Sequence, residues 1–202
     1  MTTFLMIILF AFLLLSLLAI PFFLLSKKKE LYSEKQERSP ESLWNLLNAQ
    51  LVTLNEQGKF TEALKVAQDA SKLASKIFGE NNDKYAIALN KLAAIYKREG
   101  RYDEAESHFK QAMEIWQKTF GEEHTNIAYS LNNLAEIYLS KSKFAEAEEN
   151  YKKSLKIFER NLGKDHINVA SVLENLAYLY AKTNKKEEAE KLEKRAKEIR
   201  SK

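Results

Sequence analysis

The chain has 202 residues, enough for one ordinary domain and a short additional segment. Its 32 Lys and Arg residues are interleaved with 28 Asp and Glu residues, so the formal net charge is only +4. This mixed pattern is typical of a solvated surface and argues against a nucleic-acid-binding face. The sequence contains no cysteine, which excludes disulfides, thiolate metal sites and a cysteine nucleophile.

The N-terminal segment is strongly apolar. Residues 1–26 carry no charged side chain, and residues 4–25 form an apolar run broken only by Ser16 and Pro21. As a helix this run would extend about 33 Å, enough to cross about 30 Å of hydrocarbon. We therefore expect a transmembrane anchor that contacts the lipid bilayer. The alternative is a cleaved signal peptide, but the run is too long for one, and it has neither a basic residue before it nor a small-residue cleavage site at its end.

Basic residues follow the apolar run directly, at Lys27–Lys29, and none precedes it. The positive-inside rule then predicts a single-pass protein with its C-terminal part on the cytoplasmic side. Residues 27–43 are polar and contain Ser39–Pro40, so we expect a linker there.

From Trp44 onward the sequence repeats every 42 residues. Three markers share this period: a Leu-Ala-x-x-Tyr run, a Glu-Ala pair, and an apolar residue followed by glycine. The Leu-Ala-x-x-Tyr run occurs at 92–96, 134–138 and 176–180. The Glu-Ala pair occurs at 62–63, 104–105, 146–147 and 188–189. The apolar residue followed by glycine occurs at 78–79, 120–121 and 162–163. The period predicts four units in residues 44–202, at about 44–85, 86–127, 128–169 and 170–202.

Each unit is predicted to contain two helices. In the second unit, Leu89, Leu92, Ala93 and Tyr96 recur at the spacing of one face of an α-helix. A second such face, around Phe109, follows a break at Glu99–Arg101. Neither helix can bury its apolar face alone, so the units must stack. The expected fold is therefore all-α, a solenoid of helical hairpins.

The second and third units resemble the tetratricopeptide repeat (TPR). The matching residues are Leu89, Leu92, Ala93, Tyr96, Gly100, Tyr102, Ala105, Phe109 and Ala112, then Leu131, Leu134, Ala135, Tyr138, Phe144, Ala147 and Tyr151. The longer period, the segments Gly121–His124 and Gly163–His166, and the run Leu131–Ala135 resemble the kinesin light chain type. The resemblance covers about 44–202. The first unit matches less well, and the charged helix from Lys186 is expected to cap the stack.

The resemblance implies a superhelical groove, lined by the first helices of the units, that holds a peptide or helix of a protein partner. By register the groove residues here are Asn48, Asn90, Lys91, Lys97, Arg98, Tyr129, Asn132, Asn133, Glu174, Asn175, Tyr178 and Lys182. Asparagine amides suit the backbone of an extended peptide; the alternative is that they are inherited with the repeat and only face water. Lys91, Lys97 and Arg98 suit an acidic peptide or a C-terminal carboxylate, or form a solvated charged face.

His124 and His166 occupy equivalent positions in the loops between units. No third ligand recurs with them, so loop capping or hydrogen bonding between helices is favoured over a metal site. The sequence also lacks a phosphate-binding glycine loop and the hydrolase and metalloprotease motifs. We therefore expect no enzymatic activity, no cofactor or metal, and no nucleic-acid or small-molecule substrate.

The sequence as a whole predicts a membrane-anchored adaptor or scaffold that binds a partner in its groove. The alternative is an assembly factor or accessory subunit of a membrane protein complex, in which the apolar helix itself packs against other helices.

Overall fold

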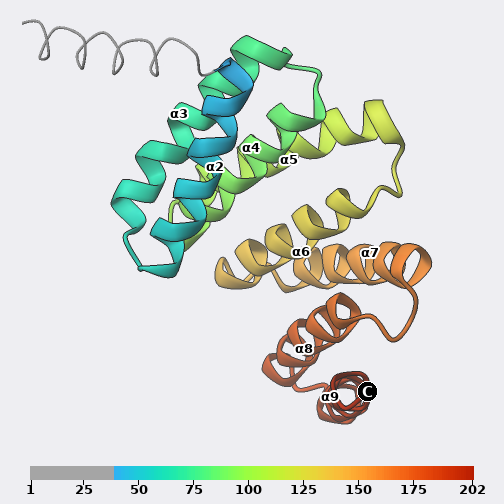
Figure 1. Cartoon of the computed structure of the whole chain (residues 1–202). Helices are drawn as coiled ribbons and strands as arrows, with labels where there is room; N and C mark the ends of the chain where they lie inside the picture. Colours follow the sequence, from blue (N-terminus) through green and yellow to red (C-terminus); the bar gives the residue numbers. More distant parts are fainter. Residues whose placement is uncertain (1–38) are drawn as a thin grey trace, which may run out of the picture. The chain divides into compact units, whose positions relative to one another are not determined.

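The computed structural model describes residues 39–202; the predicted anchor at 1–26 and most of the predicted linker lie outside this range. The described part contains eight α-helices and no strands (Figure 1). They are α2 (Pro40–Glu56), α3 (Phe60–Phe78), α4 (Asp83–Arg98), α5 (Tyr102–Phe120), α6 (Thr125–Ser140), α7 (Phe144–Leu162), α8 (Ile167–Lys182) and α9 (Lys186–Arg200). None of these helices is both long and apolar enough to cross a bilayer.

Helix α2 begins inside the predicted linker 27–43, since its first residue is Pro40. Proline is favoured in the first helical turn, where its missing N–H leaves no intrahelical hydrogen bond unmade. Residues Trp44–Lys202 form one compact unit, and the description below concerns that unit.

The helices pair into four hairpins whose turns share one geometry. In each turn a backbone N–H donates to the carbonyl five residues earlier, for example Arg101 to Tyr96 at 2.9 Å and Lys143 to Tyr138 at 2.8 Å. The residue before each donor has a positive φ: Gly58, Gly100, Ser142 and Asn184. This is the hydrogen-bond pattern that closes a helix on a left-handed residue. The turn therefore recurs with the sequence period even where glycine has been replaced.

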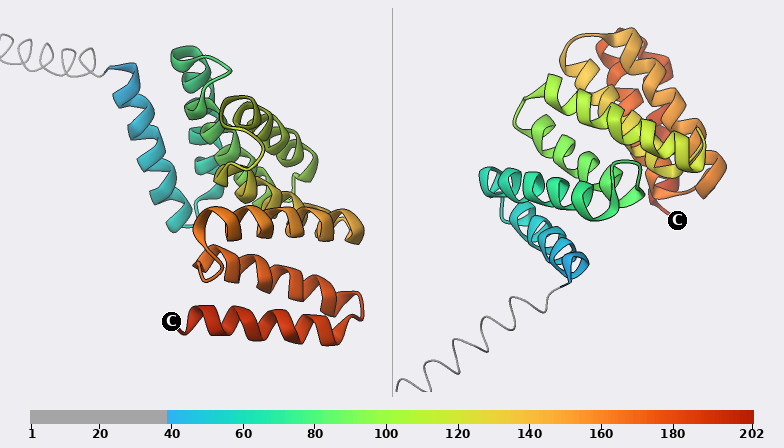
Figure 2. Two further views of the ribbon diagram at one scale, coloured as in Figure 1. Left: turned by 90° about the vertical axis from the view of Figure 1, so that its right-hand side faces the viewer. Right: turned by 90° about the horizontal axis from the view of Figure 1, so that it is seen from above.

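Small residues from both helices of a hairpin are buried in the core. They are Ala93 and Ala105, Ala135 and Ala147, and Ala177 and Ala189. Larger buried side chains complete this core, among them Phe109, Trp116, Tyr151 and Phe158. Successive hairpins also pack together, with α4 on α3, α6 on α5 and α8 on α7 (Figure 2). The buried residues consequently form clusters that extend across the units.

A tyrosine near the end of each of α4, α6 and α8 hydrogen-bonds to the preceding unit. The hydroxyl of Tyr138 donates to Glu106 Oε1 and that of Tyr180 donates to Glu148 Oε1, both at 2.9 Å. Lys152 and Lys185 also bond to Glu148. The Lys152 hydrogen bond, with those from Lys185 and Tyr180, lowers the pKa of Glu148 to about 2. The carboxylate is therefore ionised at neutral pH and bonded to both units.

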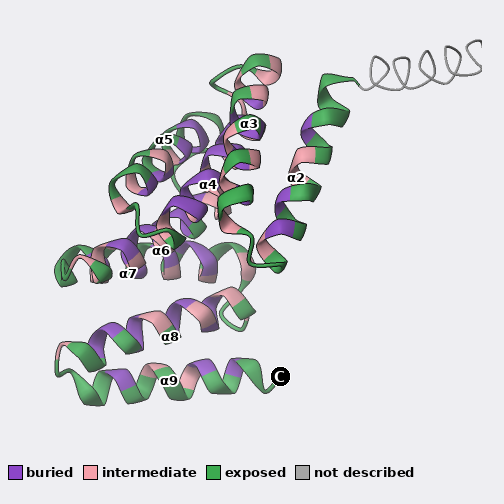
Figure 3. Ribbon diagram, turned by 90° about the vertical axis from the view of Figure 1, so that its left-hand side faces the viewer, coloured by how far each residue is buried: buried purple, intermediate pink, exposed green. Residues whose placement is uncertain are grey.

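The last helix has few buried side chains. In α9 they are Ala189, Ala196 and Ile199, and most other side chains are charged and exposed (Figure 3). Charged residues cover the side that a further unit would contact, as expected for a capping helix.

Candidate partner-binding groove

The first helices α2, α4, α6 and α8 carry the predicted groove residues, and polar side chains join these helices from unit to unit. Lys91 Nζ donates to Asn48 Oδ1 at 2.6 Å. Asn175 Nδ2 donates to Asn132 Oδ1 at 3.1 Å. Ser130 Oγ donates to Asn90 Oδ1 at 2.8 Å. Several predicted asparagines therefore bond to neighbouring units, and do not simply face water.

The centre of the groove is organised by Lys97 and Glu136. Lys97 Nζ donates to Glu136 Oε2 at 2.5 Å and to Asn133 Oδ1 at 2.6 Å. The other carboxylate oxygen, Glu136 Oε1, accepts from Asn132 Nδ2 at 2.9 Å. Glu136 was not among the predicted groove residues, although the repeat register places it near the predicted basic cluster, and it neutralises one of the three cations there. The sequence feature that could have identified Glu136 as a groove residue is its position in the repeated run Leu134–Tyr138.

A cavity of about 500 Å³ opens between α2, α4 and α6. Its apolar wall comes from Leu51, Val52, Ala94 and Ile95. The polar residues around it are Asn55, Asn133, Lys91, Lys97 and Arg98. Sequence reasoning identified the polar side of this cavity except Asn55, and missed the apolar wall. The register contained the signal, because Val52 and Ala94 precede Glu136 by two periods and one period.

Two cations beside this cavity, Lys91 and Arg98, have no carboxylate partner in the described part of the chain. Within residues 39–202, neither Lys91 nor Arg98 takes part in an ion pair. Lys91 bonds to the neutral amide of Asn48, and burial lowers its pKa. The guanidinium of Arg98 lies 4.6 Å from the centre of the Phe60 ring. An incoming carboxylate would therefore meet positive charge that the protein has not already neutralised.

The C-terminal end of the groove differs. Arg200 donates to both carboxylate oxygens of Glu174, at 2.5 and 2.7 Å, and this hydrogen bonding lowers the pKa of Glu174. Tyr178 is 56% exposed, with Lys182 Nζ 5.3 Å from its ring centre. A smaller cavity of about 270 Å³ adjoins Glu174 and Tyr178. This end offers an exposed aromatic ring with Lys182 beside it, and Glu193 and Lys197 also line the smaller cavity.

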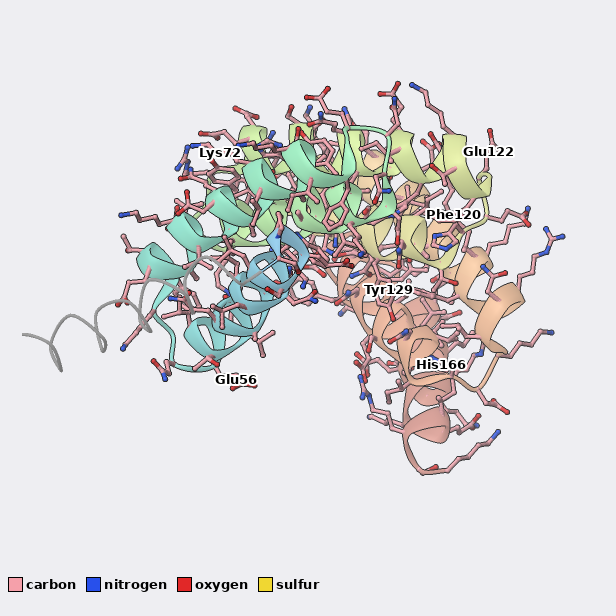
Figure 4. The ribbon with its side chains drawn as sticks, turned by 45° about the horizontal axis from the view of Figure 1, so that its top comes forward. Glu56, Lys72, Phe120, Glu122, Tyr129 and His166 are labelled. Atoms are coloured by element: carbon pink, nitrogen blue, oxygen red, sulfur yellow. The ribbon has the colours of Figure 1, made fainter. Side chains whose placement is uncertain are left out.

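Tyr129 does not line either of these two cavities. Its ring meets Phe158 edge-on, with the ring centres 4.9 Å apart, and its hydroxyl accepts a hydrogen bond from Asn168 Nδ2 at 2.5 Å. The side chain lies on α6 (Figure 4) and contacts α7 and the beginning of α8. Of the predicted residues, the structure therefore brings Lys91, Lys97, Arg98 and Asn133 together at one cavity.

His124 and His166 cap the N-termini of α6 and α8. His124 Nδ1 accepts the backbone N–H of Asn126, and His166 Nδ1 accepts that of Asn168, at 3.4 and 3.1 Å. Asn82 caps α4 in the same way through Oδ1. These bonds confirm the loop-capping interpretation. The structure arranges no group of three or more His, Cys, Asp or Glu residues for a metal ion anywhere in 39–202.

The sequence matches the tetratricopeptide repeat family over residues 45–111, 85–160 and 127–202. Together these matches span the helical stack, and the chain belongs to this family. Tetratricopeptide repeat domains bind protein partners and are typically non-enzymatic scaffolds. No curated protein matches the chain.

Solved structures share the fold. BtubC (BKLC) from P. vanneervenii superposes with a TM-score of 0.73 at 26% identity, covering 87% of this chain and 73% of that one. The kinesin light chain nearly identical TPR-like repeats from Podosopora anserina superpose with a TM-score of 0.64 at 22% identity, covering 84% and 81%. A second crystal structure of those repeats, carrying one substitution, gives 0.66 at the same identity and coverage. The predicted kinesin light chain-like architecture is thus confirmed as a fold, whereas the groove residues stay a prediction.

Proposed function

We propose that this protein is a membrane-tethered, non-enzymatic adaptor whose groove binds an acidic peptide segment of a protein partner. One observation carries the proposal: a cavity with an apolar wall is bordered by Lys91 and Arg98, which lack carboxylate partners among the described residues. An acidic side chain would pair with these cations, and a neighbouring apolar side chain would cover Val52 and Ala94.

The groove also favours an extended peptide backbone beside the cavity. Asn133 Nδ2 donates to the Tyr129 carbonyl at 2.9 Å, while its Oδ1 accepts from Lys97. The nitrogen and the oxygen of the Asn133 side-chain amide are therefore both hydrogen-bonded, which fixes the orientation of the amide at the border of the cavity. A fixed amide lowers the entropy cost of binding, because little side-chain freedom remains to be lost.

Selection from a random peptide display library tests the proposed chemistry. The purified full chain in detergent micelles should enrich acidic peptides, and the double change Lys91→Ala and Arg98→Ala should weaken their binding by about tenfold or more. The exposed Lys72 on α3 (Figure 4) supplies a matched control, since Lys72→Ala removes a positive charge away from the cavity. Enrichment of neutral or basic peptides, or binding indifferent to the double change, would contradict the proposal.

The membrane part of the proposal rests on the uncharged residues 1–26 and on the basic residues that follow them. Tethering raises the local concentration of a partner near the bilayer without requiring high intrinsic affinity. The full chain should stay with membranes after alkaline carbonate washing, and protease added to the cytoplasmic side should digest the TPR domain. Release by carbonate, or protection of that domain, would refute the anchor or its orientation respectively.

An assembly factor for a membrane complex is the second candidate, and the same apolar segment motivates it. Exchanging residues 1–26 for an unrelated transmembrane helix separates the two functions. An adaptor should still recruit its partner after the exchange, whereas a subunit that packs through this helix should lose its place in the complex.

A further inference from the structure

Glu136 is a carboxylate at a position that the other units leave uncharged. The residues one period before and one period after it are Ala94 and Tyr178, and Val52 stands two periods before it. The repeat fold therefore does not require a carboxylate at this position. Val52 and Ala94 line the cavity between α2, α4 and α6, so this position faces the groove. The carboxylate of Glu136 is consequently a feature of the groove of this protein and not of the repeated hairpin.

Hydrogen bonds from α4, α6 and α8 hold the Glu136 carboxylate in place. Oε2 accepts a hydrogen bond from Lys97 Nζ on α4 at 2.5 Å. Oε1 accepts from Asn132 Nδ2 on α6 at 2.9 Å and from Asn175 Nδ2 on α8 at 3.5 Å. The side chains of Lys97 and Glu136 keep 20% and 35% of their surface, so solvent screens this ion pair only in part. Lys97 is thus already occupied by a carboxylate of the protein itself.

Lys97 borders the same cavity as Lys91 and Arg98. If Lys97 were free, the cavity would present three cations and would suit a run of acidic residues. Glu136 removes one of these cations from the surface available to a partner. Further along the groove, α8 contributes another carboxylate, Glu174, beside the smaller cavity. A second acidic residue of a partner would therefore have to displace Glu136 from Lys97 or lie close to a carboxylate.

We propose that Glu136 is a specificity-determining residue: it restricts the partner to a segment with one acidic residue beside an apolar one, and it rejects acidic runs. The inference rests on the proposed function, because it concerns the acidic peptide proposed for the same cavity. One acidic side chain pairs with Lys91 and Arg98, whereas a second must compete with Glu136 for Lys97. That exchange replaces one ion pair with another and leaves two carboxylates side by side, so it adds little affinity. Like-charge contacts of this kind discriminate among partners.

Two synthetic peptides that differ by one charge test this selection. The first contains a single Asp between Leu and Asn, and in the second this Asn is replaced by Asp. The parent, as the full chain in detergent micelles, should bind the two peptides with affinities within about threefold of each other. Glu136→Gln frees Lys97 and should bind the two-Asp peptide about tenfold or more tighter than the one-Asp peptide. Fluorescence anisotropy measures each dissociation constant.

The matched control is Glu114→Gln. Glu114 on α5 is also paired with a lysine, Lys118, at 2.7 Å, but it does not line the cavity. This variant changes the net charge equally and should keep the parent's preference. Adding Lys97→Met to Glu136→Gln should abolish the gain for the two-Asp peptide, because the freed cation is then absent. Glu136→Ala should show the same preference as Glu136→Gln, and circular dichroism checks that each variant stays helical.

Two results would overturn the inference. One is a parent that already binds the two-Asp peptide about tenfold tighter, and the other is an equal gain in Glu136→Gln and Glu114→Gln. In either case the double change Lys91→Ala and Arg98→Ala can still weaken binding of the one-Asp peptide, which would leave the proposed function intact. A parent that binds neither peptide would refute both.

Discussion

At the turn between α6 and α7, Ser142 has a φ of 58°. An L-residue in this left-handed conformation costs roughly 1–2 kcal/mol, because Cβ approaches a backbone carbonyl oxygen. Gly58 and Gly100 occupy the same position in the first two units and have open space around the place where a Cβ would lie. The third unit therefore keeps the turn although its residue is poorly suited to it.

Replacing Ser142 by glycine should stabilise the protein. We expect the free energy of unfolding to rise by about 0.5 kcal/mol, because relief of backbone strain exceeds the added entropy of the unfolded chain. Asn184→Gly is the control and should change stability less, since asparagine tolerates positive φ. Urea unfolding followed by circular dichroism measures both; a less stable Ser142→Gly variant would show that the hydroxyl makes a compensating contact.

The cap of α8 is the second feature at this scale. His166 Nδ1 satisfies one backbone N–H that has no intrahelical partner. His166→Ala should therefore lower the free energy of unfolding by about 1 kcal/mol. His166→Asn should restore most of it, since Asn82 caps α4 with the same bond. Thermal or urea denaturation measures the stability of both variants. A His166→Ala variant as stable as the parent would show that the cap does not stabilise the protein.

Between elements, the tyrosine–glutamate bonds connect α8 to α7 and α6 to α5. Burial of Glu106 opposes its ionisation, but hydrogen bonds from Lys110, Tyr138 and Lys141 outweigh it and lower its pKa to about 2. Glu148 also has a pKa of about 2. The ionised form of each carboxylate is therefore more stable in the folded protein than in the unfolded chain, where these hydrogen bonds are absent.

Acid should weaken these links in a defined range. Because the folded-state pKa of Glu148 is lowered, its contribution is present above the ordinary value of 4.5 and is lost as pH falls toward about 2. Glu148→Gln should lower stability at pH 7 by about 1 kcal/mol or less, since the site is partly solvated. It should also reduce the fall in stability between about pH 5 and pH 2. Unfolding curves of the parent and the Glu148→Gln variant across this pH range test the prediction. The same pH dependence in both proteins would show that Glu148 does not contribute to stability through these hydrogen bonds.

At the scale of the whole molecule, each unit contributes its own hairpin and its contacts with neighbouring units. A central unit has neighbouring units on both sides, whereas within residues 39–202 the first unit has a neighbouring unit on one side. In such a solenoid the total stability is approximately a sum of unit and interface terms. Damage to a central hairpin should therefore disrupt more of the molecule than equal damage to the first one.

Two arginine substitutions test this expectation. Ala135 and Ala63 occupy close-packed positions, and both have 0% exposure. Ala135→Arg should lower the free energy of unfolding by at least about 3 kcal/mol, because overpacking and an unpaired charge disrupt two interfaces. Ala63→Arg should cost about 1–2 kcal/mol less, because the first unit has one interface. Denaturant unfolding with hydrogen-exchange mapping compares the two variants. Equal losses of unfolding free energy, with exchange increased in the same residues, would refute the model in which stability is a sum of unit and interface terms.

The sequence by itself determined the helices, the period and the stacking register. Apolar spacing along a helix is a local property, and three repeated markers fix how far one unit lies from the next. The close-packed alanines, the charged last helix and the histidine caps followed from that register. The predicted segment 1–26 lies outside the described residues and stays a prediction.

Tertiary structure decided which groove charges stay available. Lys91, Lys97 and Arg98 look equivalent in the sequence, but Lys97 bonds to Glu136 on the first helix of the next unit, whereas Lys91 bonds only to an amide. The register aligns Val52 and Ala94 with Glu136, but only the tertiary structure shows that the two apolar side chains line a cavity. Such partners depend on the rotation and distance between neighbouring first helices. The repeat period specifies the register of those helices, but it does not specify which side-chain atoms come within bonding distance.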